Sequence, residues 1–172
     1  MDTGIAHAHA TGGYAERRAS CETGARALGV ESLREVSAAD LDRARGLLDE
    51  VTFRRVRHVV TEDQRVLDTV RALREHGPAA IGGLLDASHA SLRDDFEVSA
   101  PELDLAVETA QANGALGARM TGGGFGGSAL ALVPADAGSR VLIALDGAFA
   151  EHGFGQPDLF TVRASAGARR ES

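Results

Sequence analysis

Apolar residues recur at intervals of three and four along most of the chain, the pattern of amphipathic helices that bury one face. The longest run of this kind spans residues 53–73 and predicts one long helix. Shorter runs predict further helices over residues 14–28, 41–48, 81–92, 102–110 and 141–149. Gly29 and Asn113–Gly114 are placed to end two of these helices, and Ser99 with Glu102 matches a capping box.

Two short apolar runs, residues 115–120 and 128–133, flank a cluster of glycines, and Pro134 ends the second run. Runs of this length next to turn residues indicate strands. Residues 159–162 read as a last short strand before a polar tail. Helices mixed with three or four short strands, in no regular alternation, indicate an α+β fold.

The glycine cluster places five glycines in the six positions from Gly122 to Gly127, interrupted by Phe125. Glycine weakens regular helices and strands, so the cluster indicates positive φ angles or a backbone that another group approaches closely. The N–H groups of such a loop can also converge on phosphate oxygens. The alternative is a flexible surface turn.

Two common nucleotide motifs fit this loop poorly. The spacing of Gly122, Gly124 and Gly127 satisfies G-x-G-x-x-G, but a dinucleotide-binding fold needs a helix directly after the glycines, where a strand is predicted here. A Walker loop needs Gly-Lys-Ser/Thr, and the chain contains no lysine, which excludes that class of site.

Composition limits the class of protein further. The 172 residues suit one domain, and 44% of them are hydrophobic, enough for a globular core. A net charge of −7, with basic residues dense only at Arg17–Arg18 and Arg54–Arg57, suggests neither a nucleic-acid nor a membrane partner. The single cysteine, Cys21, excludes an internal disulfide, and no signal peptide or long apolar run is visible. We therefore expect a soluble, cytoplasmic protein.

Few residues suggest chemistry by themselves. His7 and His9 have no nearby partners to complete a metal site, and His58 and His76 lie on predicted helices in structural positions. The adjacent carboxylates of Asp94 and Asp95 diverge by about 100° on a helix, so capping or contact with Arg93 is favoured over magnesium binding.

Tyr14 is the one tyrosine of the chain. A phenol offers a flat apolar face to a sugar ring and a hydroxyl to one sugar oxygen, although a core or capping role is the usual alternative.

The stretch Gly117–Gly127, Gly-Ala-Arg-Met-Thr-Gly-Gly-Gly-Phe-Gly-Gly, resembles the third motif of galactokinases, which are GHMP small-molecule kinases. The resemblance covers nearly the whole chain and keeps the order of the family. It extends over the segments Tyr14–Glu22, Glu31–Val36, Phe53–Val60 and Ser88–Asp104. Ser128 and Ala100 stand where the family often has cysteine, and both are small.

The resemblance implies a GHMP kinase C-terminal domain, in which a ferredoxin-like-type sheet packs against several helices. Residues 1–13 would be a remnant of the inter-domain core strand and linker, residues 14–166 the domain, and residues 167–172 a polar tail. Tyr14 would line the sugar site. The nucleotide-site loop would comprise Gly122, Gly123, Gly124, Phe125, Gly126 and Gly127.

Galactokinases phosphorylate galactose at its C1 hydroxyl with ATP and Mg²⁺, in a site between two domains. The family's first two motifs, its catalytic base and the arginine partner of that base are not found in this chain, so we expect no catalytic residue and no metal ligand here. ATP and Mg²⁺ would be bound mainly by an N-terminal galactokinase half. Because phosphoryl transfer depends on positioning and charge stabilisation, the chain alone is expected to be inactive.

The chain is thus expected to be the C-terminal portion of a galactokinase, from a truncated product, a split gene or a misplaced start codon. One alternative is a non-catalytic sugar or nucleotide sensor of galactokinase descent. Another is a kinase for a related sugar such as N-acetylgalactosamine or arabinose.

Overall fold

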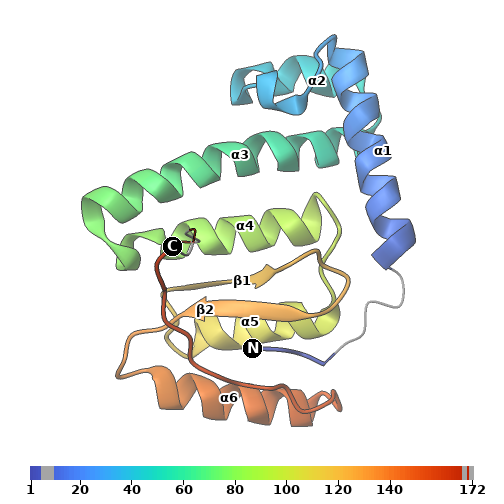
Figure 1. Cartoon of the computed structure of the whole chain (residues 1–172). Helices are drawn as coiled ribbons and strands as arrows, with labels where there is room; N and C mark the ends of the chain where they lie inside the picture. Colours follow the sequence, from blue (N-terminus) through green and yellow to red (C-terminus); the bar gives the residue numbers. More distant parts are fainter. Residues whose placement is uncertain (5–9, 168–169, 171–172) are drawn as a thin grey trace.

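The computed structural model describes residues 1–4, 10–167 and 170 (Figure 1). Its helices and strands are α1 (Ala10–Leu28), α2 (Leu41–Leu47), α3 (Glu50–His76), α4 (Gly82–Asp94), α5 (Pro101–Ala112), β1 (Gly117–Thr121), β2 (Ser128–Leu132) and α6 (Gly138–Glu151). Three short 3₁₀ helices, η1 (Leu33–Glu35), η2 (Ala38–Asp40) and η3 (Pro78–Ile81), connect them. The helices expected from apolar periodicity are all present, and the α+β prediction is confirmed.

The sheet is small. β1 and β2 pair antiparallel, with Met120 opposite Ala129. The first residues extend this layer, because the backbone of Met1 exchanges hydrogen bonds with Ala129, and Asp2 exchanges two with Asp158. The strand predicted at residues 159–162 is wrong, since pairing in that region is limited to an isolated bridge at Asp158.

One hydrophobic core lies between the sheet and the two helices α5 and α6, which pack against each other beneath it in Figure 1. Small side chains such as Ala118 and Ala129 on the strands allow this close approach. The largest fully buried side chains of this core are Leu103, Val107, Met120, Leu145 and Phe149.

Helix α4 runs along the edge of β1 that no strand covers. The side chain of Asp86 accepts a hydrogen bond from the backbone N–H of Ala118 at 2.8 Å, and Nδ1 of His89 accepts one from Met120 at 3.3 Å. An uncovered strand edge would expose unpaired N–H groups to other chains. Helix α4 therefore closes the sheet with side-chain acceptors in place of a further strand.

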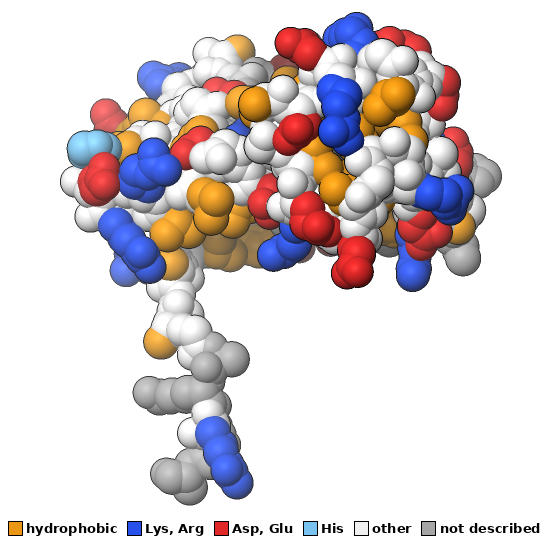
Figure 2. Space-filling model, turned by 90° about the horizontal axis from the view of Figure 1, so that it is seen from above, with side chains coloured by type: hydrophobic (Ala, Val, Ile, Leu, Met, Phe, Trp, Pro, Cys, Tyr) orange, Lys and Arg blue, Asp and Glu red, His pale blue; other side chains and the backbone are white. Residues whose placement is uncertain are grey.

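A second core joins α1, α2 and the first half of α3 through Leu28, Ala44, Phe53 and Val56. The second half of α3 is amphipathic as predicted, but Val66 and Leu67 are more than half exposed. Seen from the side of α3, apolar side chains form patches between charged ones (Figure 2).

The helix ends follow the expected residues in two cases and depart from them in one. Gly29 and Gly114 have positive φ after α1 and α5, as predicted. The capping box at Ser99–Glu102 is wrong, because Ala100 is the N-cap residue of α5. The hydroxyl of Ser99 instead donates to the carboxylate of Asp104 at 2.5 Å.

Burial determines the protonation of His58, on the inner face of α3. Its ring stacks on Phe96 with centroids 4.5 Å apart, and its Nδ1 lies 2.9 Å from the hydroxyl of Ser91. Burial lowers the pKa of His58 to about 4, from 6.5 for an unburied imidazole, and the opposing charges of Glu62 and Arg65 change it less. The folded protein therefore keeps a neutral ring at pH values where the unfolded chain takes up a proton.

Replacing His58 by glutamine is expected to reduce the loss of stability on acidification. Stability that depends on the neutral ring is complete above pH 6.5 and is lost as the pH falls towards 4, because only the unfolded chain binds the proton in that window. At about 1.36 kcal/mol for each pH unit, the wild type should lose roughly 2 to 3 kcal/mol more than His58→Gln between pH 7 and pH 4.5. Urea unfolding at the two pH values measures this difference.

His76→Gln is the matched control, because His76 is exposed at the C-terminal end of the same helix. It should follow the wild-type pH dependence. Equal acid losses in the wild type and in His58→Gln would contradict the prediction.

Candidate functional site

The glycine loop between β1 and β2 has backbone φ angles that favour glycine. Gly122, Gly124, Gly126 and Gly127 have φ angles between +84° and +125°, and Phe125 has a φ of +61°. Residues with a β-carbon rarely adopt this region. The positive φ angles expected from the glycine cluster are therefore present.

Two glycines of this loop are also needed because other groups lie too close to leave room for a β-carbon. A β-carbon added to Gly123 would overlap the hydroxyl of Tyr14, and one added to Gly124 would overlap the carbonyl oxygen of Val98. Tyr14 belongs to α1 and Val98 to the turn before α5. The loop is therefore held between two distant segments, and the interpretation as a flexible surface turn is wrong.

Phe125 anchors the loop to the same two segments. Its backbone N–H donates to the carbonyl of Val98 at 2.7 Å, and its ring meets the ring of Tyr14 edge to face, with centroids 5.9 Å apart. A β-carbon on Gly13 would overlap the Phe125 ring, so the start of α1 lies directly on it. The guanidinium of Arg17 lies 5.4 Å from the ring centroid.

Tyr14 is 46% exposed although its ring touches Phe125. Part of the phenol therefore faces solvent directly beside the glycine loop. The structure thus brings together the two features that sequence analysis singled out separately, one near the start of the chain and one in its second half. Bare glycine backbone and a partly exposed aromatic ring form a surface that a polar ligand with an apolar face can approach.

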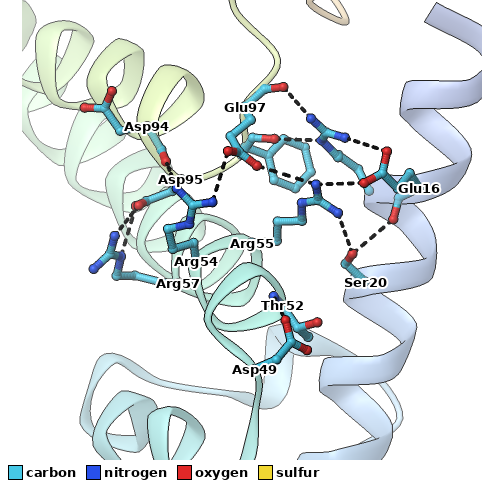
Figure 3. A network of polar contacts seen from close by, with 12 residues as sticks. Glu16, Ser20, Asp49, Thr52, Arg54, Arg55, Arg57, Asp94, Asp95 and Glu97 are labelled. Atoms are coloured by element: carbon cyan, nitrogen blue, oxygen red, sulfur yellow. Dashed lines mark hydrogen bonds and ion pairs between the residues drawn. The ribbon is translucent and has the colours of Figure 1, made fainter.

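A network of charged side chains connects α1, α3 and the turn at residues 96–98 (Figure 3). Arg17 donates to the backbone carbonyls of Phe96 and Glu97, and the carboxylate of Glu97 pairs with Arg54 at 3.0 Å and Arg55 at 3.5 Å. Arg55 is 4% exposed and also contacts Glu16 and Ser20 on α1. The network fixes α1, α3 and the turn at residues 96–98 relative to one another.

Sequence analysis missed this network, because it treated the pairs Arg17–Arg18 and Arg54–Arg55 only as surface charge. One signal was present in the sequence. Arg17 and Arg55 fall on the apolar sides of helical patterns, where a charged group must find partners if it is buried.

The carboxylates of Asp94 and Asp95 point to different partners (Figure 3). Asp94 accepts hydrogen bonds from Arg93 at 2.8 and 3.2 Å, the contact that was favoured, and this contact holds the pKa of Asp94 below its usual value. Asp95 accepts from Arg57 and from Ser91. Within the described part of the chain, no group of three or more His, Cys, Asp or Glu side chains could hold a metal ion.

Among the other residues singled out from the sequence, Cys21 is described by the structure, whereas His7 and His9 are not. Cys21 is half-buried, and burial raises the pKa of its thiol, which disfavours the reactive thiolate. His7 and His9 lie outside the described residues, as do positions 168, 169, 171 and 172 of the predicted tail. No described helix is both long enough and apolar enough to cross a membrane.

Comparison with known proteins gives consistent matches. A family model described as "GHMP kinases C terminal" matches residues 69–151. The galactokinase of Streptomyces coelicolor is 56% identical over 172 residues, which are 99% of this chain and 44% of that protein. The galactokinase of Mycobacterium tuberculosis H37Rv is 48% identical over 98% of this chain and 46% of its own length. The chain thus spans less than half the length of these curated relatives.

Solved structures agree with the sequence matches. The galactokinase of Lactococcus lactis, solved in complex with galactose, has a TM-score of 0.84 and 39% identity over 91% of this chain and 42% of that one. A mevalonate kinase of L. major has a TM-score of 0.52 at 22% identity, a likeness of fold alone.

Proposed function

We propose that this chain, which matches the GHMP kinase C-terminal family model and galactokinases, is the C-terminal portion of a galactokinase and serves the ATP-dependent phosphorylation of galactose to galactose 1-phosphate. The observation behind the proposal is the contact between Tyr14 and Gly123, which joins a sugar-binding type of side chain to a phosphate-binding type of loop. We propose Tyr14 as a residue of the galactose site and residues 122–127 as part of the nucleotide site.

The chain supplies only part of what the reaction needs. Transfer of a phosphoryl group requires a positioned hydroxyl, a base to accept its proton, and charge to stabilise the transferring group. The glycine loop fits the role of a backbone surface against a phosphate chain, because five of its six residues lack a β-carbon and four of these glycines have positive φ angles. We propose that ATP and Mg²⁺ are bound mainly by an N-terminal galactokinase half, which is then the partner of this domain in the cytoplasm.

Two alternative functions are compatible with the same residues. A non-catalytic sugar or nucleotide sensor would use the same loop and Tyr14 without turnover. A kinase for N-acetylgalactosamine or arabinose would differ only in its sugar. Identity of 56% to a galactokinase over the whole chain favours galactose among these substrates.

The test uses a chimera, defined as the Streptomyces coelicolor galactokinase with its matching portion replaced by this chain. We expect the chimera to release ADP with galactose and magnesium-ATP, and mass spectrometry to detect galactose 1-phosphate. The 172-residue chain alone is expected to release no ADP above background, because the chain lacks the motifs expected to hold the triphosphate and the base.

The donor's N-terminal portion without this chain is the control. An inactive but folded chimera that still binds galactose would favour the sensor. Faster turnover with N-acetylgalactosamine or arabinose than with galactose would identify a different sugar kinase. Galactose 1-phosphate formed by the chain alone would contradict the assignment of the catalytic groups to the other half.

A further inference from the structure

We propose that Arg17 and Glu97 are positioning residues, which hold the turn at residues 96–98 and thereby set the conformation of the glycine loop. This inference rests on the proposed function for its kinetic consequence, but its structural content can be measured in the chain by itself. Neither side chain is proposed to touch a substrate.

Arg17 binds the turn from the side of α1. Its Nε donates to the carbonyl of Phe96 at 2.7 Å and its Nη2 to the carbonyl of Glu97, so one planar guanidinium fixes two consecutive peptide groups. The residue is 8% exposed, and burial lowers the pKa of its guanidinium. The buried guanidinium of Arg17 is stabilised mainly by these backbone carbonyls, because the carboxylate that it contacts, Glu16, is exposed.

Glu97 binds the turn from the side of α3. Its φ angle is +55°, a conformation that residues with a β-carbon rarely adopt, and Phe125 is the other non-glycine described residue with positive φ. Such conformations persist where surrounding contacts over-determine them. Here the contacts are the ion pairs of its carboxylate with Arg54 and Arg55 and the bond from Arg17 to its carbonyl.

The turn touches the loop through Val98. Its carbonyl oxygen accepts the hydrogen bond from the N–H of Phe125, and the same oxygen occupies the space that a β-carbon on Gly124 would need. The guanidinium of Arg17 also lies beside the Phe125 ring. The two non-glycine residues with positive φ, Glu97 and Phe125, are therefore linked through one carbonyl group, and a shift of the turn must shift the loop.

The first experiment measures hydrogen exchange by NMR in the 172-residue chain. We expect Arg17→Lys and Glu97→Gln each to raise the exchange rate of the Phe125 amide at least about tenfold, because lysine cannot bind two carbonyls in a plane and glutamine loses the charge that pairs with two arginines. The amide of Val107, inside α5, should stay within about twofold of the wild type. Arg18→Lys is the matched control, because Arg18 is exposed on the same helix and pairs with Glu22 on its own helix.

The second experiment measures kinetics in the chimera. Arg17→Lys should lower kcat about tenfold through displacement of the loop, with the KM for galactose within about twofold of the wild type. Glu97→Gln should act in the same direction, and Arg18→Lys should have no effect.

Unchanged exchange at Phe125 in both variants would overturn the proposal. Equal acceleration at Phe125 and Val107 would also overturn it, because the two residues would then stabilise the whole fold without positioning the loop in particular. If the wild-type chimera is inactive, the proposed function fails, while the exchange experiment still decides whether Arg17 and Glu97 position the loop.

Discussion

Replacing Gly124 by alanine is expected to lower the kcat/KM of the chimera for galactose by at least about a hundredfold, and to destabilise the domain as well. Gly124 has a φ of +84°, and its β-carbon would overlap the Val98 carbonyl and crowd the end of the buried Met120 side chain. Neither neighbour can move freely, because the carbonyl is hydrogen-bonded to Phe125 and Met120 lies in the core. Steady-state kinetics and thermal unfolding of the same preparations measure both effects.

The substitution Gly123→Val should separate the loss of activity from the loss of stability. The group in its way is the phenol end of Tyr14, a side chain that is 46% exposed and can be displaced towards solvent at the cost of its contact with Phe125. We therefore expect a comparable loss of activity, with a melting temperature of the isolated domain within a few degrees of the wild type.

Gly147→Ala is the control, because this helix residue of α6 has open space around it and alanine favours helices. It should leave kinetics unchanged and raise stability slightly. If Gly123→Val retained full activity, the loop would be an ordinary connection between strands, and the nucleotide-site assignment of residues 122–127 would be wrong.

The parts of this fold that the sequence predicts are those that depend on neighbours in the chain. Helical periodicity depends on which face of a segment is buried, so the long pattern over residues 53–73 located α3 correctly. Positive φ at Gly122 and Gly127 follows from the same local reasoning, since only glycine adopts that region easily. The order of helices, strands and loop was therefore predictable.

The remaining features depend on groups far apart in the chain. Residues 159–162 have the composition of a strand, but a strand also needs a partner, and backbone pairing stops at Asp158. Ser99 has the spacing of a capping residue, but Asp104 takes its hydroxyl hydrogen bond. Likewise, nothing local to Glu97 indicates its positive φ, because the arginines that hold it come from α1 and α3.

Removal of the Tyr14 side chain is expected to raise the KM of the chimera for galactose about tenfold to a hundredfold, and to leave the KM for ATP within about twofold. The ring and hydroxyl together offer a stacking face and one hydrogen bond, worth on the order of 1 to 3 kcal/mol. Initial rates of Tyr14→Ala, measured as a function of each substrate in turn, test the assignment. A changed KM for ATP with an unchanged KM for galactose would contradict the sugar-site role of Tyr14.

Tyr14→Phe divides this effect between the two parts of the side chain. Phenylalanine keeps the edge-to-face contact with Phe125 and removes only the hydroxyl beside Gly123. If the hydroxyl binds the sugar, the KM for galactose should rise about tenfold in Tyr14→Phe, close to the value of one hydrogen bond. If the ring face contributes most, Tyr14→Phe should resemble the wild type and only Tyr14→Ala should be impaired. Equal galactose KM values in all three proteins would show that Tyr14 supports the glycine loop without contacting the sugar.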